Sequence, residues 1–190
     1  MNLIKKGSGD IGILMLHGRG SDAEDIISLH EYFNATCYAF TANNNQWYPL
    51  PFNMSKSSNE PFLADNINLV IETYKKLKKE HNKIFLLGFS QGACLALEIA
   101  SKNEIDGVIA FSGGLIGSDS EISVLKKSKV FIGCSHNDPF IPFTRAKKTV
   151  ELFEGTNSNV ITSFYEGNTH TITSEELSSA IHFFNDISTS

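Results

Sequence analysis

The sequence contains little of what marks membrane-spanning, secreted or nucleic-acid-binding proteins. Its 190 residues include 16 Lys and Arg against 21 Asp and Glu, and a net charge of −5 argues against a basic surface for phosphate backbones. The longest apolar run covers residues 11–16, far short of the roughly 18 residues that cross a bilayer. We therefore predict a cytoplasmic protein with no membrane span and no nucleic-acid partner.

Cysteine is also scarce. Cys37, Cys94 and Cys134 are an odd number at wide spacings, with no CxxC pair and no nearby histidine of the zinc-site type. A chain of this length buries enough surface to fold without disulfides or a metal. We expect three reduced core cysteines and no metal site.

Short apolar runs alternate with helix-length amphipathic segments. Near-continuous hydrophobicity is typical of strands that are covered on both faces, as in a parallel sheet. Alternating units of this kind predict an open α/β sheet flanked by helices, and no linker or repeat divides the chain, so we expect one domain over residues 1–190. The expected strands are residues 11–16, 37–41, 83–87, 107–111, 130–134 and 160–165.

Three helix starts can be predicted from capping signals. Ser21 with Glu24, and Thr173 with Glu176, have the spacing of a capping box before an apolar face. Pro61 precedes the longest helical pattern and is expected to begin it.

Residues 43–60 form one stretch without periodicity. It is rich in Asn and Ser, yet it carries Trp47, Tyr48 and Phe52. A loop of this length inside a compact domain is uncommon unless it is functional or disordered, and its aromatic residues favour function.

The strongest local pattern is Gly88-Phe89-Ser90-Gln91-Gly92, between a predicted strand and a predicted helix. This is the G-x-S-x-G pattern of a nucleophile elbow in the strand-turn-helix context that it requires; without that context it would be an ordinary tight turn. The two glycines are needed because a side chain there would collide with the adjacent strand and helix. Ser90 is thus a candidate nucleophile.

A serine needs a base, and in α/β-hydrolases the acid and then the histidine follow the nucleophile in the chain. His170 lies just past the last predicted strand, where ligands bind in open α/β sheets. Asp138 follows the preceding strand and would orient its imidazole, with Asp119 as the alternative acid. The other histidines after Ser90 fit less well, because one precedes Asp138 and the other lies on a solvated helix side: His136 and His182.

Four motifs together carry a family resemblance: LHGRG at 16–20, GFSQGA at 88–93, DPFIP at 138–142 and GNTH at 167–170. In order and spacing they resemble the phospholipase/carboxylesterase family of α/β-hydrolases, which includes carboxylesterases and acyl-protein thioesterases. The resemblance implies an α/β-hydrolase fold with a mostly parallel sheet and no separate cap domain. It also implies a Ser90, His170 and Asp138 triad that forms an acyl-enzyme, and no cofactor.

The same resemblance places an oxyanion hole at the backbone amides of Arg19 and Gln91. Many family members have an apolar residue in place of Arg19, whose side chain could pair with a neighbouring acid or with a substrate carboxylate. Trp47 and Phe140 are the predicted substrate-binding residues. His17 is interpreted as a side chain that braces the oxyanion loop.

The expected substrate is a small acyl ester or a thioester. Lysophospholipids, acylated proteins and lactones are alternatives, and a hydrolase-like binding module without turnover is a further one. A homodimer is possible through the aromatic loop.

Overall fold

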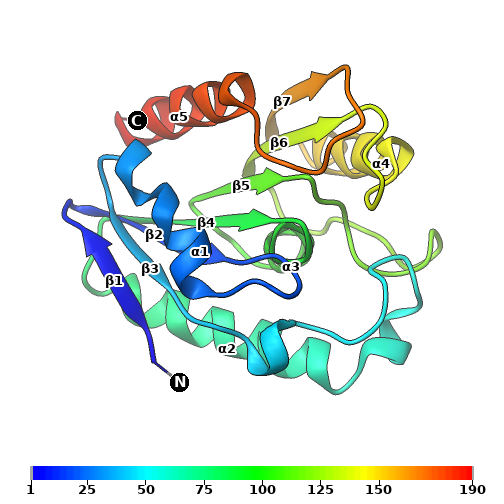
Figure 1. Cartoon of the computed structure of the whole chain (residues 1–190), viewed down its shortest axis with the longest axis horizontal. Coiled ribbons are helices and arrows are strands. Elements are labelled where there is room, and N and C mark those ends of the chain that lie inside the picture. The colour runs from blue at the N-terminus through cyan, green and yellow to red at the C-terminus, as the bar shows by residue number, and fades with distance from the viewer. Residues whose placement is uncertain (1, 190) are drawn as a thin grey trace.

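One seven-stranded sheet organises the computed structural model, which describes residues 2–189 (Figure 1). The strand order is β1-β3-β2-β4-β5-β6-β7; β1 runs antiparallel to β3, and every other neighbouring pair is parallel. The strands are β1 (Ile4–Gly7), β2 (Ile11–Leu16), β3 (Thr36–Ala39), β4 (Lys83–Phe89), β5 (Gly107–Phe111), β6 (Lys129–Ser135) and β7 (Asn159–Tyr165).

Helices cover both faces of the sheet. In β2, Leu14 and Leu16 join the core shared with α2 (Phe62–Leu77), α3 (Gln91–Ala100) and α4 (Phe143–Glu154). Ile13 and Met15 point to the opposite core, which is shared with α1 (Ala23–Ile27) and α5 (Ser174–Thr189). The predicted α/β class is confirmed, and no separate cap is present among the described residues. None of the helices within residues 2–189 is both long and apolar enough to cross a membrane.

Sequence and structure differ most at the edges of the sheet. The bounds of β2 and β5 are those predicted, and the other central strands agree within two residues. The short β1 was not predicted, because its sequence IKKG has no apolar run and is mostly exposed. At the opposite edge β7 is partly exposed, with Ile161 at 43% exposure, so it is not covered on both faces as expected.

Two of the three predicted helix starts agree with the structure. Glu176 N donates to Thr173 Oγ1, and Thr173 N donates to Glu176 Oε2, which is the predicted capping box. Pro61 is the N-cap of α2. The third prediction is wrong: Asp22, not Ser21, caps α1 and accepts from the amide of Asp25. Aspartate is as strong an N-cap as serine, so the pattern fits both registers.

The loop between β3 and α2 contains two short 3-10 turns, η2 (Asn43–Asn45) and η3 (Lys56–Asn59); a third, η1 (Ser28–Tyr32), extends α1. The loop is packed rather than loose, since Trp47 and Tyr48 are fully buried.

All three cysteines are buried and free, as predicted. Burial raises the pKa of Cys37 and Cys134 to about 12 and that of Cys94 to about 11. Burial therefore favours the neutral thiol over the nucleophilic thiolate at neutral pH.

Candidate active site

Ser90 lies on a sharp turn between β4 and α3, in the left-handed region with φ 53° and ψ −117°. A Cβ added to Gly92 would come within 2.1 Å of the carbonyl oxygen of Leu16, and one added to Gly88 within 2.4 Å of the Gly92 backbone. Only glycine lets β4, α3 and β2 approach this closely. The turn lifts the serine hydroxyl above the carboxyl end of the sheet and places it at the start of a buried helix, whose N-terminal amides favour negative charge.

Ser90, His170 and Asp138 form one hydrogen-bonded chain. His170 Nδ1 donates to Asp138 Oδ2 at 2.8 Å, because a carboxylate can only accept. This fixes the tautomer, so His170 Nε2 accepts from the Ser90 hydroxyl, also at 2.8 Å. Three loops that lie far apart in the sequence supply these groups, each at the carboxyl end of a strand. The arrangement can deprotonate the hydroxyl and stabilise the resulting imidazolium.

The carboxylate of Asp138 is held rigidly. Its side chain is buried, and its second oxygen, Oδ1, accepts from the amides of Phe140 and Ile141 at 2.8 and 2.9 Å. The alternative acid Asp119 is placed elsewhere, where it pairs with Arg145 at 2.7 Å.

The two other histidines after Ser90 are not part of this chain. His136 pairs with Glu166 at 2.6 Å, and His182 is exposed on α5, as predicted.

The loop after β2 lies against the nucleophile. A Cβ on Gly18 would be 3.5 Å from the Cβ of Ser90. His17 braces this loop as predicted: Nδ1 donates to the carbonyl of Gly18 at 2.7 Å, and Nε2 accepts from the amide of Ala42 at 3.0 Å. Burial lowers the pKa of His17 and keeps it neutral, which these two opposite roles require.

The side chain of Arg19 is tied to the aromatic loop. Its guanidinium donates to the carbonyls of Tyr48, Pro49 and Leu50 at 2.7 to 3.1 Å and to the side chain of Gln46 at 3.0 Å. Of the two alternatives considered for this side chain, pairing with a neighbouring acid is not seen: within residues 2–189 it makes no ion pair with Asp22 or Glu24. This role could not be predicted, because backbone carbonyls are acceptors that the sequence does not reveal.

A cavity of about 720 Å³ opens beside Ser90. Phe140, a predicted substrate-binding residue, lines it, and its ring packs edge-on against that of His170 with 4.8 Å between centroids. Most of the other lining is apolar, and the two basic groups in it are Arg19 and His170. The lining residues are Arg19, Tyr48, Pro51, Phe52, Asn53, Ser90, Gln91, Cys94, Pro139, Phe140, Ile141, Pro142 and His170.

The prediction that Trp47 contacts substrate is wrong. The side chain is fully buried, its indole nitrogen donates to the carbonyl of His17 at 2.8 Å, and its ring packs against His17 and Phe40. Trp47 therefore supports the loop after β2 from below. Its neighbours Tyr48 and Phe52 line the cavity instead. The sequence marked the loop as aromatic but could not tell which rings face inward.

Glu176 is a buried acid close behind the histidine loop. Its Oε1 has no hydrogen-bond partner among the described residues, and it packs so tightly on β6 that a Cβ at Gly133 would overlap it. Burial raises the pKa of Glu176 to about 7, and the nearby negative charge of Asp138 acts in the same direction.

The mostly parallel sheet, the serine elbow after β4 and the histidine after β7 define the chain as an α/β-hydrolase. The sequence pattern of the Phospholipase/Carboxylesterase family matches residues 10–188, and the chain belongs to that family. Acyl-protein thioesterase 1 of Debaryomyces hansenii is 30% identical in an alignment of 171 positions that covers 81% of this chain and 74% of that protein. The family is one of hydrolases.

Solved structures agree with the fold. A phospholipase/carboxylesterase from Dyadobacter fermentans is 34% identical, with a TM-score of 0.86 over 95% of this chain and 94% of that one. The Bacillus cereus carboxylesterase has a TM-score of 0.81 at 21% identity and covers 98% of this chain and 94% of that one. The second likeness supports the fold alone.

Proposed function

We propose that the protein hydrolyses carboxylic esters or thioesters through an acyl-enzyme on Ser90. The observation that carries the proposal is the continuous chain of 2.8 Å hydrogen bonds from Ser90 through His170 to Asp138. A serine in this position is activated by a neutral imidazole whose tautomer is fixed by a buried carboxylate.

In the proposed mechanism, Ser90 Oγ attacks the acyl carbonyl carbon while His170 Nε2 takes its proton. The backbone amides of Arg19 and Gln91 would bind the oxyanion; neither amide donates to another group of the described chain. His170 then gives its proton to the leaving oxygen or sulfur, and the C–O or C–S bond breaks. Water, deprotonated by the same imidazole, releases the acid and restores Ser90.

The cavity supports an acyl group as the part of the substrate bound beside Ser90. Its volume of about 720 Å³ and its apolar lining suit a short or medium acyl chain. The thioester alternative draws its support from the acyl-protein thioesterase of D. hansenii, to which the chain is similar.

A fluorophosphonate probe and a panel of p-nitrophenyl esters test the proposal. We expect the probe to label the wild-type protein at Ser90 and to leave Ser90→Ala unlabelled, with hydrolysis falling at least about 10³-fold. Ser112→Ala is the matched control, because Ser112 is a buried serine with φ 51° at the end of the neighbouring strand. Equal labelling of wild type and Ser90→Ala would refute the assignment. A protein that hydrolyses neither ester nor thioester would instead be a binding module.

A further inference from the structure

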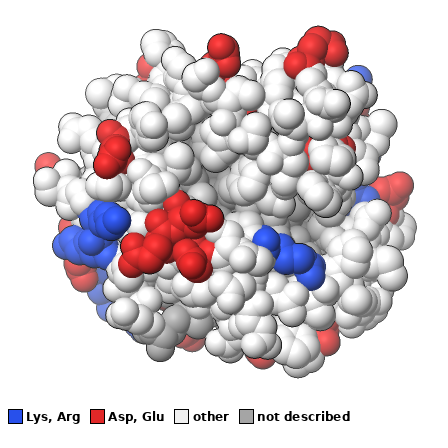
Figure 2. Space-filling view, viewed as in Figure 1, with Lys and Arg blue, Asp and Glu red and all other residues white. Residues whose placement is uncertain are grey.

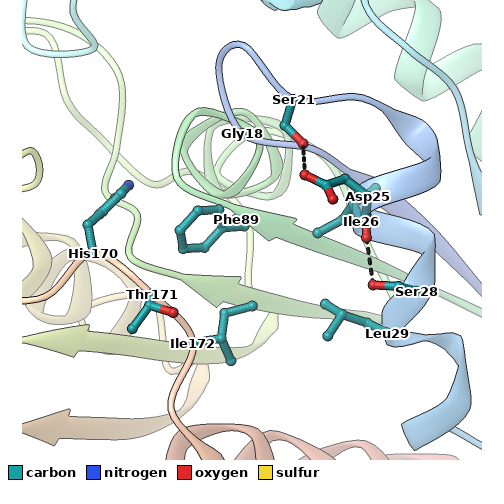
Figure 3. A pocket seen from close by; sticks show the side chains of 10 residues that line it. All are labelled: Gly18, Ser21, Asp25, Ile26, Ser28, Leu29, Phe89, His170, Thr171 and Ile172. Atoms are coloured by element: carbon teal, nitrogen blue, oxygen red, sulfur yellow. Dashed lines mark hydrogen bonds between the residues drawn. The ribbon is translucent and has the colours of Figure 1, made fainter.

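A second pocket, of about 290 Å³, lies between α1 and the loop that follows His170 (Figure 3). His170 is the one lining residue, within the described chain, that this pocket shares with the larger cavity. Gly18 of the oxyanion loop and Phe89, which directly precedes Ser90, also line it. The pocket therefore adjoins the site of the reaction.

The pocket has an apolar floor and a polar rim. Phe89 forms the centre of the floor, and its ring lies 4.9 Å from that of His170. Figure 3 shows Ile26, Leu29 and Ile172 around Phe89, while Ser21, Asp25 and Ser28 lie on the side away from His170.

Asp25 gives the rim its charge. One carboxylate oxygen accepts from the hydroxyl of Ser21 at 2.7 Å. No lysine or arginine lines the pocket, so this charge has no counter-ion within it. Glu24 lies outside the pocket lining and pairs with Lys6 at 3.8 Å, so its charge is offset away from the pocket. Figure 2 shows acidic side chains gathered over α1, beside the central hollow of this face.

The chemistry of the reaction decides which part of the substrate this pocket receives. The group that leaves is the one that His170 must protonate, so it has to lie beside the imidazole. The larger apolar cavity takes the acyl group in the proposed function, and the pocket on α1 remains for the alcohol or thiol. An aromatic floor with a carboxylate at its edge attracts an organic cation.

We propose that the pocket between α1 and the His170 loop is a leaving-group site that favours esters of small cationic alcohols, such as amino alcohols and their quaternary forms. The inference rests on the proposed ester hydrolysis and adds its substrate class. The volume of about 290 Å³ lies just below the roughly 300–1,000 Å³ of pockets that enclose drug-sized ligands, which suits a small head group. The acidic rim repels anionic leaving groups, such as an alcohol that carries a phosphate.

The test compares three esters that share the acyl group preferred in the aryl-ester panel. Their alcohols are choline, its neutral isostere with carbon in place of the ammonium nitrogen, and an alcohol that carries a phosphate. We expect wild-type kcat/KM to be about fivefold higher for choline than for the isostere, and lowest for the phosphate ester. In Asp25→Asn, which keeps an oxygen for Ser21, the choline preference should fall to about twofold or less while hydrolysis of the isostere is retained.

Glu24→Gln is the matched control, since it removes one charge from the same helix but does not line the pocket. It should keep the wild-type preference. Equal rates for choline and isostere in wild type, or an unchanged preference in Asp25→Asn, would overturn the inference and leave ester hydrolysis standing. If wild type hydrolyses neither these esters nor the aryl esters, the proposed function itself fails.

Discussion

The side chain of Gln91 holds the backbone of Trp47 and Tyr48. Its Oε1 accepts from the Trp47 amide at 2.9 Å, and its Nε2 donates to the Tyr48 carbonyl at 2.7 Å. Gln91 is the first residue of α3, directly after Ser90. The start of the helix and the aromatic loop therefore form one buried unit. Gln91, whose backbone amide is proposed to bind the oxyanion, thus also holds the aromatic loop through its side chain.

Replacing Gln91 by alanine should loosen this unit. The change leaves the buried Trp47 amide without a partner, at about 1–3 kcal/mol, while the Tyr48 carbonyl keeps its hydrogen bond from Arg19. We therefore expect the free energy of unfolding to fall by about 2 kcal/mol. Urea denaturation measures this. The control Gln46→Ala removes a more exposed amide that bonds only to Arg19, and it should lower the free energy of unfolding by less than about 1 kcal/mol. Equal losses in the two variants would contradict the role of Gln91.

Arg19 holds the same loop from the outside, and its replacement should disturb the site before it disturbs the fold. In Arg19→Met we expect kcat/KM for aryl esters to fall about tenfold, because the Arg19 amide and the cavity wall both lose their support. The emission of Trp47, the only tryptophan in the chain, should shift to longer wavelength as its loop loosens. Arg19→Lys should not restore activity, since an ammonium group cannot reproduce the planar fork that binds several carbonyls. Full activity in Arg19→Lys would indicate that charge alone matters.

The two aspartates that the sequence offered as the acid can be separated by matched changes. Asp138→Asn leaves a similar shape but disfavours the tautomer in which His170 Nδ1 donates, so kcat should fall by about 10³–10⁴. Asp119→Asn removes the ion pair with Arg145, which is exposed on the aspartate side, and kcat should change by less than about twofold. Steady-state kinetics of the two variants decide the assignment. A larger loss in Asp119→Asn would reverse it.

The fold and the residues of the hydrogen-bonded chain could be predicted from the sequence, because their positions each require one type of residue. Gly88 and Gly92 are needed by close backbone approach, and Ser90, Asp138 and His170 each follow a strand whose apolar run is readable. Since parallel strands end at one edge of the sheet, their following loops are brought together whatever the loops contain.

The sequence could not predict which side chains line the cavity, because that depends on the direction in which each side chain points. Trp47 and Tyr48 are neighbours of the same chemical kind, yet only Tyr48 lines the cavity. The difference comes from partners far along the chain: the Trp47 indole donates to His17, and Gln91 fixes the backbone of both. Strand β1 was missed for a related reason, because pairing with β3 rather than its own hydrophobicity makes it a strand.

Glu176 should make stability depend on pH. Burial raises its pKa from 4.5 to about 7, so between these values the folded protein holds a proton that the unfolded chain has lost. Stability therefore falls as pH rises through this window, by about 3 kcal/mol from this group, and changes no further above it. In Glu176→Gln the contribution disappears. Between pH 5 and 8, the free energy of unfolding of the variant minus that of wild type should rise by about 3 kcal/mol.

Chemical denaturation at several pH values, followed by far-ultraviolet circular dichroism, measures this difference. The control is Glu175→Gln, which changes the neighbouring exposed glutamate on α5 and should give a pH profile parallel to that of wild type. A Glu176→Gln profile that also runs parallel to wild type would mean that the carboxyl is already ionised in the fold. That result would require a partner for Oε1, which has none among the described residues.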